Sequence, residues 1–422
     1  LLDETFTPIH DIIQNQYSEL TETKELDQTV TQFMNKWEIV GASLAIIKEG
    51  KLVYSKGYGY ADREQGIPMN VNNIFRVASI SKLITAAGIM KLLENEQLSL
   101  GSTVFGPGGI LNDTLFSHVA DRRITGITIE HLLRHQGGFS IRHADPMFNP
   151  VEIARQMNVP PPADLNAIIR YVLTKRLGFA PGSSSRYSNV GYGILTKVIE
   201  KVSGRGYEDF IRDSILLPAG CYDMHLGHNL AKDHYPNEVK YYEPANAEKI
   251  QSCTGAEEWV PKSDGGNNIE ELYGAGGWVA SPTELLRLLL AIDGNPDTPP
   301  DVLAAESVEL MTRYQANAFP MGWMHTNSSG DWWRTGTLAG TSAMMKRQAD
   351  GFCWVFITNT SNWLGPQFPQ KIDNMVKQAV NRVESWPERD LFDPDYHRDL
   401  QHSWEYLADD PFALPSSPIP GI

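Results

Sequence analysis

The segment from Leu83 to Leu93 is apolar on nearly every side of a helix for about three turns. A helix with so little polar surface is normally buried, because none of its faces gains by contacting water. Burial on all sides requires several layers of surrounding structure, which a large domain provides. The 422 residues of the chain suffice for one large domain or two interlocked ones.

The composition is that of an ordinary globular protein, with 41% hydrophobic and 21% charged residues. The chain has 36 Lys and Arg against 51 Asp and Glu, a net charge of −15. This balance argues against the basic surface that nucleic acid or anionic lipid requires, so neither is expected as a partner. No stretch approaches the roughly 20 apolar residues of a membrane-spanning helix, and no membrane span is expected.

The start of the chain and its cysteines bear on the cellular compartment. The chain begins at Leu1 and not at an initiator Met. We therefore expect that a secretory segment was removed and that the protein is exported to a periplasm or cell envelope. Three cysteines, Cys221, Cys253 and Cys353, allow at most one internal disulfide, and their spacing offers no metal site.

Strand-like runs lie near both ends of the chain. Residues 41–47 and 51–54 predict one hairpin, and residues 342–346 and 352–357 predict a second. Helical periodicity predicts helices at 26–37, 129–133, 164–173, 192–202, 283–292 and 370–383. The simplest architecture is an α/β (α+β) fold, in which one antiparallel sheet is built from both chain ends and a mostly helical region is inserted between them.

These patterns predict a discontinuous organisation. Residues 1–78 and 270–385 are expected to form the sheet domain, and residues 79–269 the helical region. Residues 386–422, rich in proline and acidic residues, are expected to form a surface tail.

The first candidate site residues precede the apolar helix. Ser79 and Lys82 stand at positions i and i+3, so their side chains share one face of the first turn. A nearly buried Lys needs a partner or a lowered pKa, and a desolvated Lys could take the proton of a nucleophilic Ser. The helix N-terminus would supply backbone N–H groups to an oxyanion. The alternative is a capping Ser beside a Lys that reaches solvent.

Two further candidates are Tyr187 and Asn189, which lie two residues apart on an extended step before a helix and can face one cavity. Tyr is a poor base unless cations stabilise its phenolate, which Lys82 could do. Asn189 could donate a hydrogen bond to a substrate carbonyl. The alternative is a Tyr packed against a loop, with Asn189 in a turn.

The last candidates form the run Arg334-Thr335-Gly336-Thr337 at the end of an aromatic strand. Gly336 would allow a ligand or a helix end to approach the backbone closely. Arg334 would supply a fixed positive charge for a substrate carboxylate, Thr335 a hydroxyl, and Thr337 a backbone N–H for an oxyanion. The alternative is that Arg334 points to solvent and that Trp residues define a neutral acyl pocket.

Three motifs in order resemble those of the serine beta-lactamase and penicillin-binding-protein-like superfamily, especially its class C beta-lactamase, esterase and D-aminopeptidase branch. Ser79-Ile80-Ser81-Lys82 matches S-x-x-K, and Tyr187-Ser188-Asn189 matches Y-x-N. Arg334-Thr335-Gly336 stands where the superfamily usually has K-T-G or H-x-G. Further similarity spans residues 26–383.

The resemblance implies a beta-lactamase/transpeptidase-like fold and an acyl-enzyme mechanism that needs no cofactor or metal. Ser79 would be the nucleophile, Lys82 and Tyr187 would share proton transfer, and Asn189 would orient a small-molecule or peptide substrate. Beta-lactams, D-amino-acid peptides and small carboxylic esters are all candidates. A structural role is implied for His135.

Other readings remain open. A non-catalytic paralogue could use the same cleft to bind a peptide or beta-lactam. A metal-dependent hydrolase would use a group of nearby side chains, namely Asp223, His225, His228 and His234, but no H-E-x-x-H motif occurs. An alpha/beta-hydrolase is disfavoured by the lack of a G-x-S-x-G motif, and no complete dinucleotide fingerprint is present.

Overall fold

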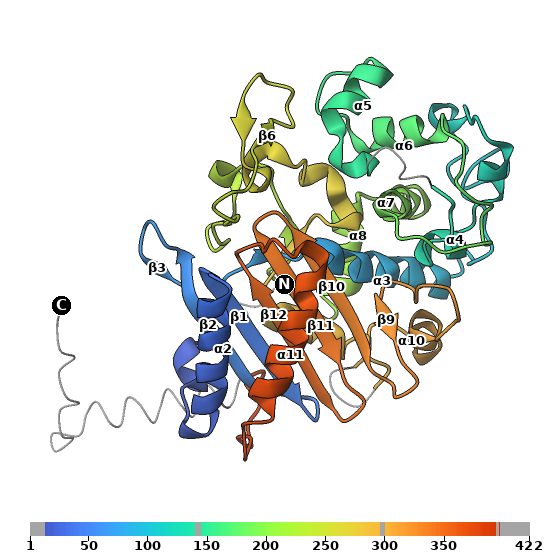
Figure 1. The fold of residues 1–422 in the computed structure, drawn as a ribbon. Helices are drawn as coiled ribbons and strands as arrows, with labels where there is room; N and C mark the ends of the chain where they lie inside the picture. The colour runs from blue at the N-terminus through green and yellow to red at the C-terminus, as the bar shows by residue number, and fades with distance from the viewer. Residues whose placement is uncertain (1–12, 140–144, 296–299, 394–395, 397–422) are drawn as a thin grey trace, which may run out of the picture.

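The computed structural model describes residues 13–139, 145–295, 300–393 and 396. A seven-stranded antiparallel sheet has the order β3-β2-β1-β12-β11-β10-β9. Its strands are β1 (Gly41–Lys48), β2 (Lys51–Asp62), β3 (Ile67–Pro68), β9 (His325–Thr326), β10 (Trp332–Leu338), β11 (Thr341–Arg347) and β12 (Phe352–Thr358). Because β1 pairs with β12, the two ends of the chain meet at the centre of the sheet, as the sequence predicts (Figure 1).

Both predicted hairpins are confirmed. Strands β1 and β2 pair through Lys48 and Lys51, and the two residues between them, Glu49 and Gly50, have φ of 51° and 78°. Two positive φ values are the requirement of the tight hairpin turn that matches the twist of the strands. Strands β11 and β12 form the second hairpin.

The central strands are buried on both faces, which explains their nearly continuous apolar sequence. In β1, Leu44 and Ile46 belong to one hydrophobic cluster, whereas Ala45 and Ile47 belong to the other. The smaller cluster lies under helices α2 (Lys24–Lys36) and α11 (Phe368–Val380), where Phe33 stacks on Phe368 with ring centroids 5.7 Å apart. The larger cluster joins the opposite face to the helical region.

The helical region surrounds α3 (Ser81–Glu94), and every residue of α3 from Ser81 to Met90 is buried. The expectation of a buried helix is therefore confirmed. Figure 1 shows α3 between the sheet and the helices above it. The other helices are α4 (Ile129–Leu133), α5 (Pro150–Met157), α6 (Leu165–Leu173), α7 (Asn189–Ser203), α8 (Tyr207–Ile211), α9 (Pro282–Leu290) and α10 (Ala305–Thr312).

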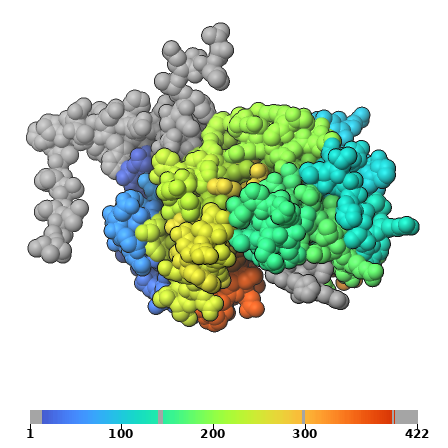
Figure 2. Space-filling view, turned by 90° about the horizontal axis from the view of Figure 1, so that it is seen from above, coloured from blue at the N-terminus to red at the C-terminus, as the bar shows by residue number. Residues whose placement is uncertain are grey.

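Short strands accompany these helices. Strands β4 (Phe75–Arg76), β8 (Trp278–Ala280) and β5 (His225–Leu226) form a small sheet, and β6 (Ile250–Gln251) pairs with β7 (Trp259–Val260). Seen from above, the green and yellow segments of this region occupy most of the visible face (Figure 2). No helix within the described part of the chain is long and apolar enough to cross a membrane.

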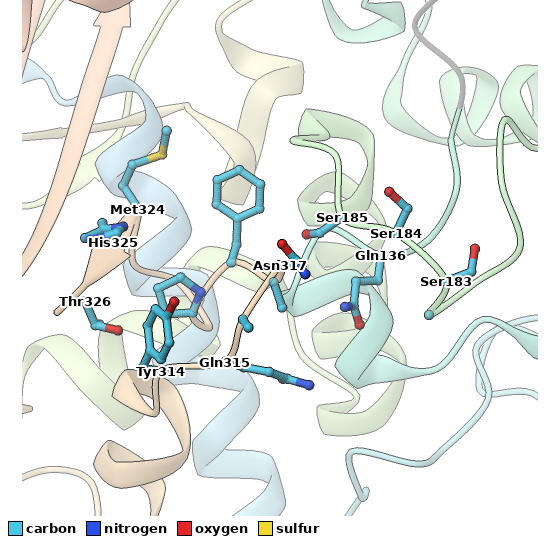
Figure 3. A pocket seen from close by; sticks show the side chains of 15 residues that line it. Gln136, Ser183, Ser184, Ser185, Tyr314, Gln315, Asn317, Met324, His325 and Thr326 are labelled. Atoms are coloured by element: carbon cyan, nitrogen blue, oxygen red, sulfur yellow. The ribbon is translucent and has the colours of Figure 1, made fainter. Parts of the chain in front are cut away.

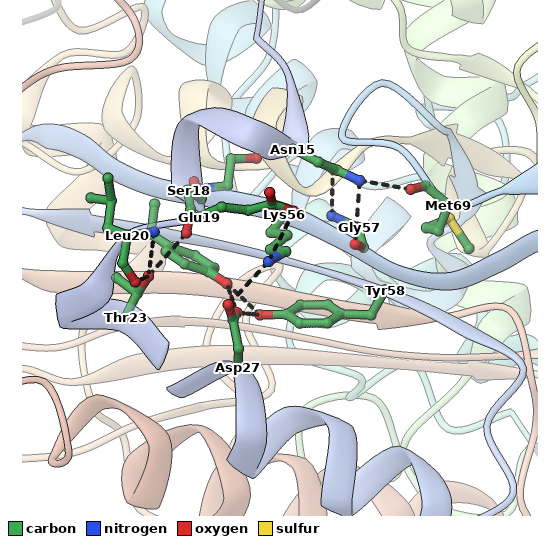
Figure 4. Close-up of polar contacts among 12 residues, drawn as sticks. Asn15, Ser18, Glu19, Leu20, Thr23, Asp27, Lys56, Gly57, Tyr58 and Met69 are labelled. Atoms are coloured by element: carbon green, nitrogen blue, oxygen red, sulfur yellow. Dashed lines mark hydrogen bonds and ion pairs between the residues drawn. The ribbon is translucent and has the colours of Figure 1, made fainter. Parts of the chain in front are cut away.

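Polar contacts tie the N-terminal segment to β2 (Figure 4). Asn15 accepts a hydrogen bond from the Gly57 N–H at 2.9 Å and donates one to the Met69 carbonyl at 2.9 Å. On α2, Asp27 accepts from the Tyr58 hydroxyl at 2.8 Å and pairs with Lys56 at 3.0 Å. These contacts fix α2 against the outer half of the sheet.

The described part of the segment after residue 385, where a surface tail is expected, is held against β2. Leu391 is fully buried, and Arg389 donates two hydrogen bonds to the Val53 carbonyl at 3.2 and 3.0 Å. Asp390 accepts the Leu52 N–H at 3.0 Å. Because these partners belong to β2, residues 389–391 attach the C-terminal segment to the start of that strand. The rest of the expected tail, 397–422, lies outside the described residues.

Candidate active site

Ser79 lies in a turn of 3-10 helix, Ala78–Ile80, directly before α3. The sequence places it in the first turn of the helix, but the α-helix begins two residues later, at Ser81. Ala78 has φ of 49°, in the left-handed region that non-glycine residues seldom adopt. Strain of this kind persists where packing over-determines the backbone, which is typical of functional sites.

Lys82 is fully buried in α3, and its ammonium group has three hydrogen-bond partners. It donates to Ser79 Oγ at 3.1 Å, to Asn189 Oδ1 at 2.7 Å and to the carbonyl of Ala275. An ammonium has three N–H donors, so all of them are used. Lys82 is thus held against Ser79 and does not reach solvent.

Tyr187 contacts the same hydroxyl from the other side. Its Oη donates to Ser79 Oγ at 2.7 Å and accepts a hydrogen bond from Arg334 Nη2 at 2.8 Å. The Tyr187 ring packs on the His135 ring, with centroids 4.5 Å apart. Ser79 Oγ is therefore within hydrogen-bond distance of two groups that can exchange its proton.

The two neighbours of Ser79 have pKa values far below their ordinary ones. Burial raises the pKa of Tyr187, but the Arg334 and Lys82 cations outweigh burial and lower that pKa to about 8. Burial lowers the pKa of Lys82 to about 8, with Tyr187 opposing this shift and Arg334 adding to it. Both groups can therefore gain and lose a proton near neutral pH, which general acid–base chemistry requires.

Asn189 is the first residue of α7, not part of an extended step as the sequence analysis expects. Ser188 caps this helix, since its side chain accepts the Gly191 N–H. The Asn189 amide accepts from Lys82 and donates to Asp145 Oδ2 at 2.6 Å. Asn189 thus links Lys82 to Asp145, and one N–H of its amide remains for a substrate.

His135 packs against the loop that carries Tyr187 and Ser188. It is 2% exposed, and its Nδ1 accepts the Ser188 N–H at 3.1 Å. Burial lowers the pKa of His135 well below its usual value, and the Arg334 and Lys82 cations add to the effect. A neutral His135 that contacts the Ser188 N–H and the Tyr187 ring has the geometry of a structural residue, which is the implied role.

Arg334 lies inside the protein, beside Ser79. It is 1% exposed, so it does not point to solvent. Its Nε donates to the Ser79 carbonyl at 2.7 Å and its Nη2 to Tyr187 Oη. Two of its three nitrogens are thus engaged within the protein, which argues against the expected contact with a substrate carboxylate but does not test it.

Residues 335–337 follow along β10. Thr335 and Thr337 line the cavity beside Ser79. Gly336 packs against the turn that carries Ser79: a Cβ at this position would lie 2.1 Å from the Val77 carbonyl oxygen. The sequence allows either a ligand or a helix end near Gly336, and the structure places the helix end there.

Gly336→Ala should therefore displace the Ser79 turn from β10. A misplacement of about 1 Å can cost about a hundredfold in catalysis, so we expect a loss of that size in the rate of any reaction at Ser79. Gly126→Ala is the matched control, because Gly126 is exposed and nothing lies within 4 Å of its built Cβ. Equal activities of the two variants would show that this packing does not position Ser79.

Ser79 opens into a cavity of about 360 Å³. The polar lining comes from Ser79, Tyr187, Asn189, Thr335 and Thr337. The remaining lining residues are apolar or glycine, namely Ala78, Phe148, Leu272, Ala275, Gly276, Met324, Leu338 and Pro366. No Lys, Arg, Asp or Glu is among the described residues that line this cavity.

The tryptophans considered for an acyl pocket lie elsewhere. Trp278, Trp323 and Trp354 are at most 2% exposed and belong to the hydrophobic core, and Trp332 packs on Trp323. None of the four lines the cavity at Ser79 within the described chain. Their packing role follows from their burial.

The histidines considered for a metal centre contact other groups. His225 pairs with Asp223 at 2.9 Å, whereas His234 Nε2 lies 3.2 Å from the buried Arg76 guanidinium. A cation at that position opposes metal binding, and burial together with Arg76 lowers the pKa of His234 to about 4. The part of the chain that the structure describes contains no group of three potential metal ligands. All three cysteines are free and buried.

Two contributors to the site are absent from the sequence analysis. Asp145, which binds the Asn189 amide, caps a short 3-10 turn and belongs to no motif. The Ala275 carbonyl, which accepts from Lys82, is a backbone group. It lies in the Gly274-Ala275-Gly276-Gly277 run, whose glycines indicate a close backbone approach, although not to which partner.

Comparisons with known proteins find similarity over most of the chain. A family model described as Beta-lactamase matches residues 26–373. The chain is 25% identical over 370 residues to Protein flp of Staphylococcus aureus strain MRSA252, an alignment that covers 85% of this chain and 66% of flp. It thus spans just under two thirds of that relative. It is 27% identical over 298 residues to Esterase EstB of Burkholderia gladioli, covering 66% of this chain and 72% of the esterase.

Solved structures show the same fold. The D-amino acid amidase from Ochrobactrum anthropi SV3, complexed with D-phenylalanine, superposes with a TM-score of 0.67 at 19% identity. The superposition covers 86% of this chain and 99% of the amidase. The expected beta-lactamase/transpeptidase-like fold is confirmed. Because the family model matches most of the chain, this protein belongs to the beta-lactamase family.

Proposed function

We propose that the protein is a serine hydrolase that cleaves neutral esters or amides through an acyl-Ser79 intermediate. The observation that carries this proposal is the position of Ser79 Oγ, 3.1 Å from Lys82 Nζ and 2.7 Å from Tyr187 Oη at the wall of a cavity. Both neighbours have pKa values of about 8. Such a pair can take a proton from a nucleophile and return it to a leaving group.

The reaction follows from these contacts. Ser79 Oγ forms a bond to the acyl carbon while its proton passes to the Lys82–Tyr187 pair. The bond between the acyl carbon and the leaving oxygen or nitrogen then breaks, and the leaving atom receives the proton. In the second half, a water loses a proton to the pair and bonds to the acyl carbon. The bond between that carbon and Ser79 Oγ then breaks, and Ser79 Oγ takes the proton back. Thr337 borders the cavity, where its backbone N–H is proposed as an oxyanion donor.

The preference for neutral substrates rests on the cavity lining. The Arg334 guanidinium is engaged with Ser79 and Tyr187, and the Lys82 donors are all used. A substrate carboxylate in this cavity would meet no cationic side chain among the described lining residues. Burying an unpaired charge is costly, so neutral acyl groups are favoured over beta-lactams or peptides with a free carboxylate. The similarity to Esterase EstB supports this substrate class.

Two nitrophenyl esters of equal acyl length test the preference. 4-Nitrophenyl butanoate is neutral, whereas 4-nitrophenyl hemisuccinate has a carboxylate at the end of its acyl chain. We expect a kcat/KM at least about tenfold higher for the butanoate, because the carboxylate finds no partner. A chromogenic cephalosporin and a D-alanyl peptide with a free C-terminus extend the panel. Faster turnover of the carboxylate substrates would contradict the preference but not the acyl-Ser79 proposal.

The pH dependence of kcat/KM tests whether Arg334 lowers the pKa values of Lys82 and Tyr187. Because the Lys82–Tyr187 pair must lose a proton before it can act as a base, the plot of kcat/KM against pH should have a rising limb centred near pH 8. This apparent pKa belongs to the pair and not to either residue alone. Arg334→Met removes a cation that lowers both pKa values, so the limb should move to higher pH by about one unit or more. Arg334→Lys keeps the charge and should restore part of the shift. A limb that stays in place in Arg334→Met would contradict this role.

A non-catalytic paralogue that binds a ligand in the same cavity is the remaining alternative. Such a protein would need the shape of the cavity but no proton-exchanging pair beside Ser79. The low pKa values of Lys82 and Tyr187 favour catalysis over binding alone. A binding protein would leave Ser79 unmodified by a serine-reactive probe.

A further inference from the structure

A second cavity of about 790 Å³ lies between two loops beside the Ser79 cavity. One loop, residues 182–185, leads to Tyr187, and the other, residues 314–320, leads towards β9. Figure 3 shows Gln136 and the three serines on one side and Tyr314, His325 and Thr326 on the other. A cavity of this volume is in the range of small-molecule sites, roughly 300–1,000 Å³.

The lining of this second cavity is polar but nearly uncharged. Charged residues make up 21% of the chain, yet none of the 15 described residues that line the cavity is Asp, Glu, Lys or Arg. His325 is the one titratable side chain among them besides Tyr314. Phosphates, carboxylates and ammonium groups therefore lack the charged partners that usually bind them. The expected ligand is polar and neutral.

Several hydrogen-bonding side chains of the lining have no partner among the described residues, although Ser183 and Ser185 donate to the Ala180 and Arg134 carbonyls. No hydrogen bond joins the side chains of Gln136, Ser184, Gln315 or Asn317 to the part of the chain that the structure describes. Each amide offers both donors and an acceptor, and Ser184 offers a hydroxyl. The Thr326 hydroxyl is buried in the cavity wall and also has no partner among the described residues. Paired donors and acceptors on one ligand, such as neighbouring hydroxyls, match these groups.

The cavity also presents an exposed aromatic ring. Tyr314 is 67% exposed, although large aromatic side chains gain from burial. Its amphipathic ring offers a flat apolar face next to the amides of Gln315 and Asn317. The C–H face of a sugar ring is a flat apolar surface bordered by hydroxyls, and it complements this arrangement better than an extended peptide with its charged side chains.

The two cavities adjoin at one side chain. Met324 lines both of them, and its Sδ lies 4.0 Å from Arg334 Nη1. Phe319 lines the second cavity and packs against Tyr187, with ring centroids 6.0 Å apart. A molecule that spans Met324 would place one part beside Ser79 and another part between the two loops.

We propose that the second cavity binds a neutral saccharide, the alcohol part of an acylated-sugar substrate. The identity of the substrate rests on the proposed function, whereas saccharide binding itself does not. In the reaction, the acyl group lies in the smaller cavity and its carbon bonds to Ser79 Oγ. The bond between this carbon and the sugar oxygen breaks, the oxygen takes a proton from the Lys82–Tyr187 pair, and the saccharide remains in the second cavity until it dissociates.

Binding is tested without turnover, on the Ser79→Ala protein. Saturation-transfer NMR with xylotetraose, cellotetraose and chitotetraose should detect at least one bound saccharide. Its affinity should be at least about tenfold lower when Tyr314→Ala is added, because one stacked aromatic contributes on that scale. Trp259→Ala is the matched control, since it removes a ring that is 69% exposed but does not line the cavity. The proposal would be overturned if none of the saccharides binds, or if Trp259→Ala lowers the affinity as much as Tyr314→Ala does. It would also be overturned if an end-blocked tetraalanine binds in place of the saccharides.

Turnover then distinguishes the two proposals. With acetylated xylotetraose and 4-nitrophenyl acetate as substrates, Tyr314→Ala should lower kcat/KM at least about tenfold more for the sugar ester than for the nitrophenyl ester. Equal losses for both esters would show that the cavity does not hold the leaving group. If saccharides bind but no ester or amide is hydrolysed, the proposed function fails and the saccharide site remains.

Discussion

Lys82→Ala should lower the kcat of ester hydrolysis by about a hundredfold or more, the usual contribution of a positioned acid or base. The variant removes the ammonium that donates to Ser79 Oγ and the cation that helps to lower the pKa of Tyr187. It also leaves the Ala275 carbonyl and Asn189 Oδ1 without their shared donor. Lys91→Ala on the same helix is the matched control, because Lys91 contacts Glu94 and Val302 and not the site.

Tyr187→Phe should cause a loss of similar size, and the double variant should lose much less than the product of the two single losses. The physical reason is that each group sets the pKa of the other: Lys82 lowers that of Tyr187, and Tyr187 raises that of Lys82 against the effect of burial. Groups that act as one unit give strongly non-additive losses. Two losses that multiply would contradict a shared proton-transfer unit.

The measurement is a four-member cycle of wild type, both single variants and the double variant, assayed at several pH values with one neutral ester. Thermal unfolding of each protein separates loss of catalysis from loss of structure, which matters because Lys82 is fully buried. A Lys82→Ala protein that unfolds at the wild-type temperature but has lost activity supports the catalytic assignment.

Local sequence signals predicted the framework of the fold well. The two hairpins have clear turn residues, and the helix at 129–133 has the same limits in the structure as in the prediction. The apolar run after Lys82 predicted a helix buried on all sides, which α3 is. These features depend on neighbours in the sequence, which is why residue patterns reveal them.

Features that depend on distant partners were predicted less well. Nothing near Arg334 in the sequence shows that its guanidinium reaches the Ser79 carbonyl, 255 residues away. Likewise, Asp145 meets Asn189 only through the packing of separate segments, and Leu391 is buried because the chain returns to β2. The apolar periodicity predicts a helix from residue 192, three residues after α7 begins at Asn189, because the cap at Ser188 is not part of that periodicity.

Ser79→Ala should lower hydrolysis of every substrate by at least about a thousandfold, the largest loss expected of any single variant. The variant removes the Ser79 oxygen, which contacts both Lys82 and Tyr187. Ser81→Ala is the matched control, since Ser81 lies two residues further on and its hydroxyl accepts the Trp278 N–H inside the core. Ser81→Ala should lower the thermal stability of the protein but not its ability to form an acyl-enzyme.

The most direct test of the acyl-Ser79 proposal is the intact mass of the protein after reaction with a fluorophosphonate. We expect one phosphonyl adduct per chain on wild type and on Ser81→Ala, mapped by peptide sequencing to Ser79, and no adduct on Ser79→Ala. Labelling of wild type should slow in Lys82→Ala and in Tyr187→Phe. An adduct that persists in Ser79→Ala, or a wild-type protein that hydrolyses esters without being labelled at Ser79, would contradict the proposal.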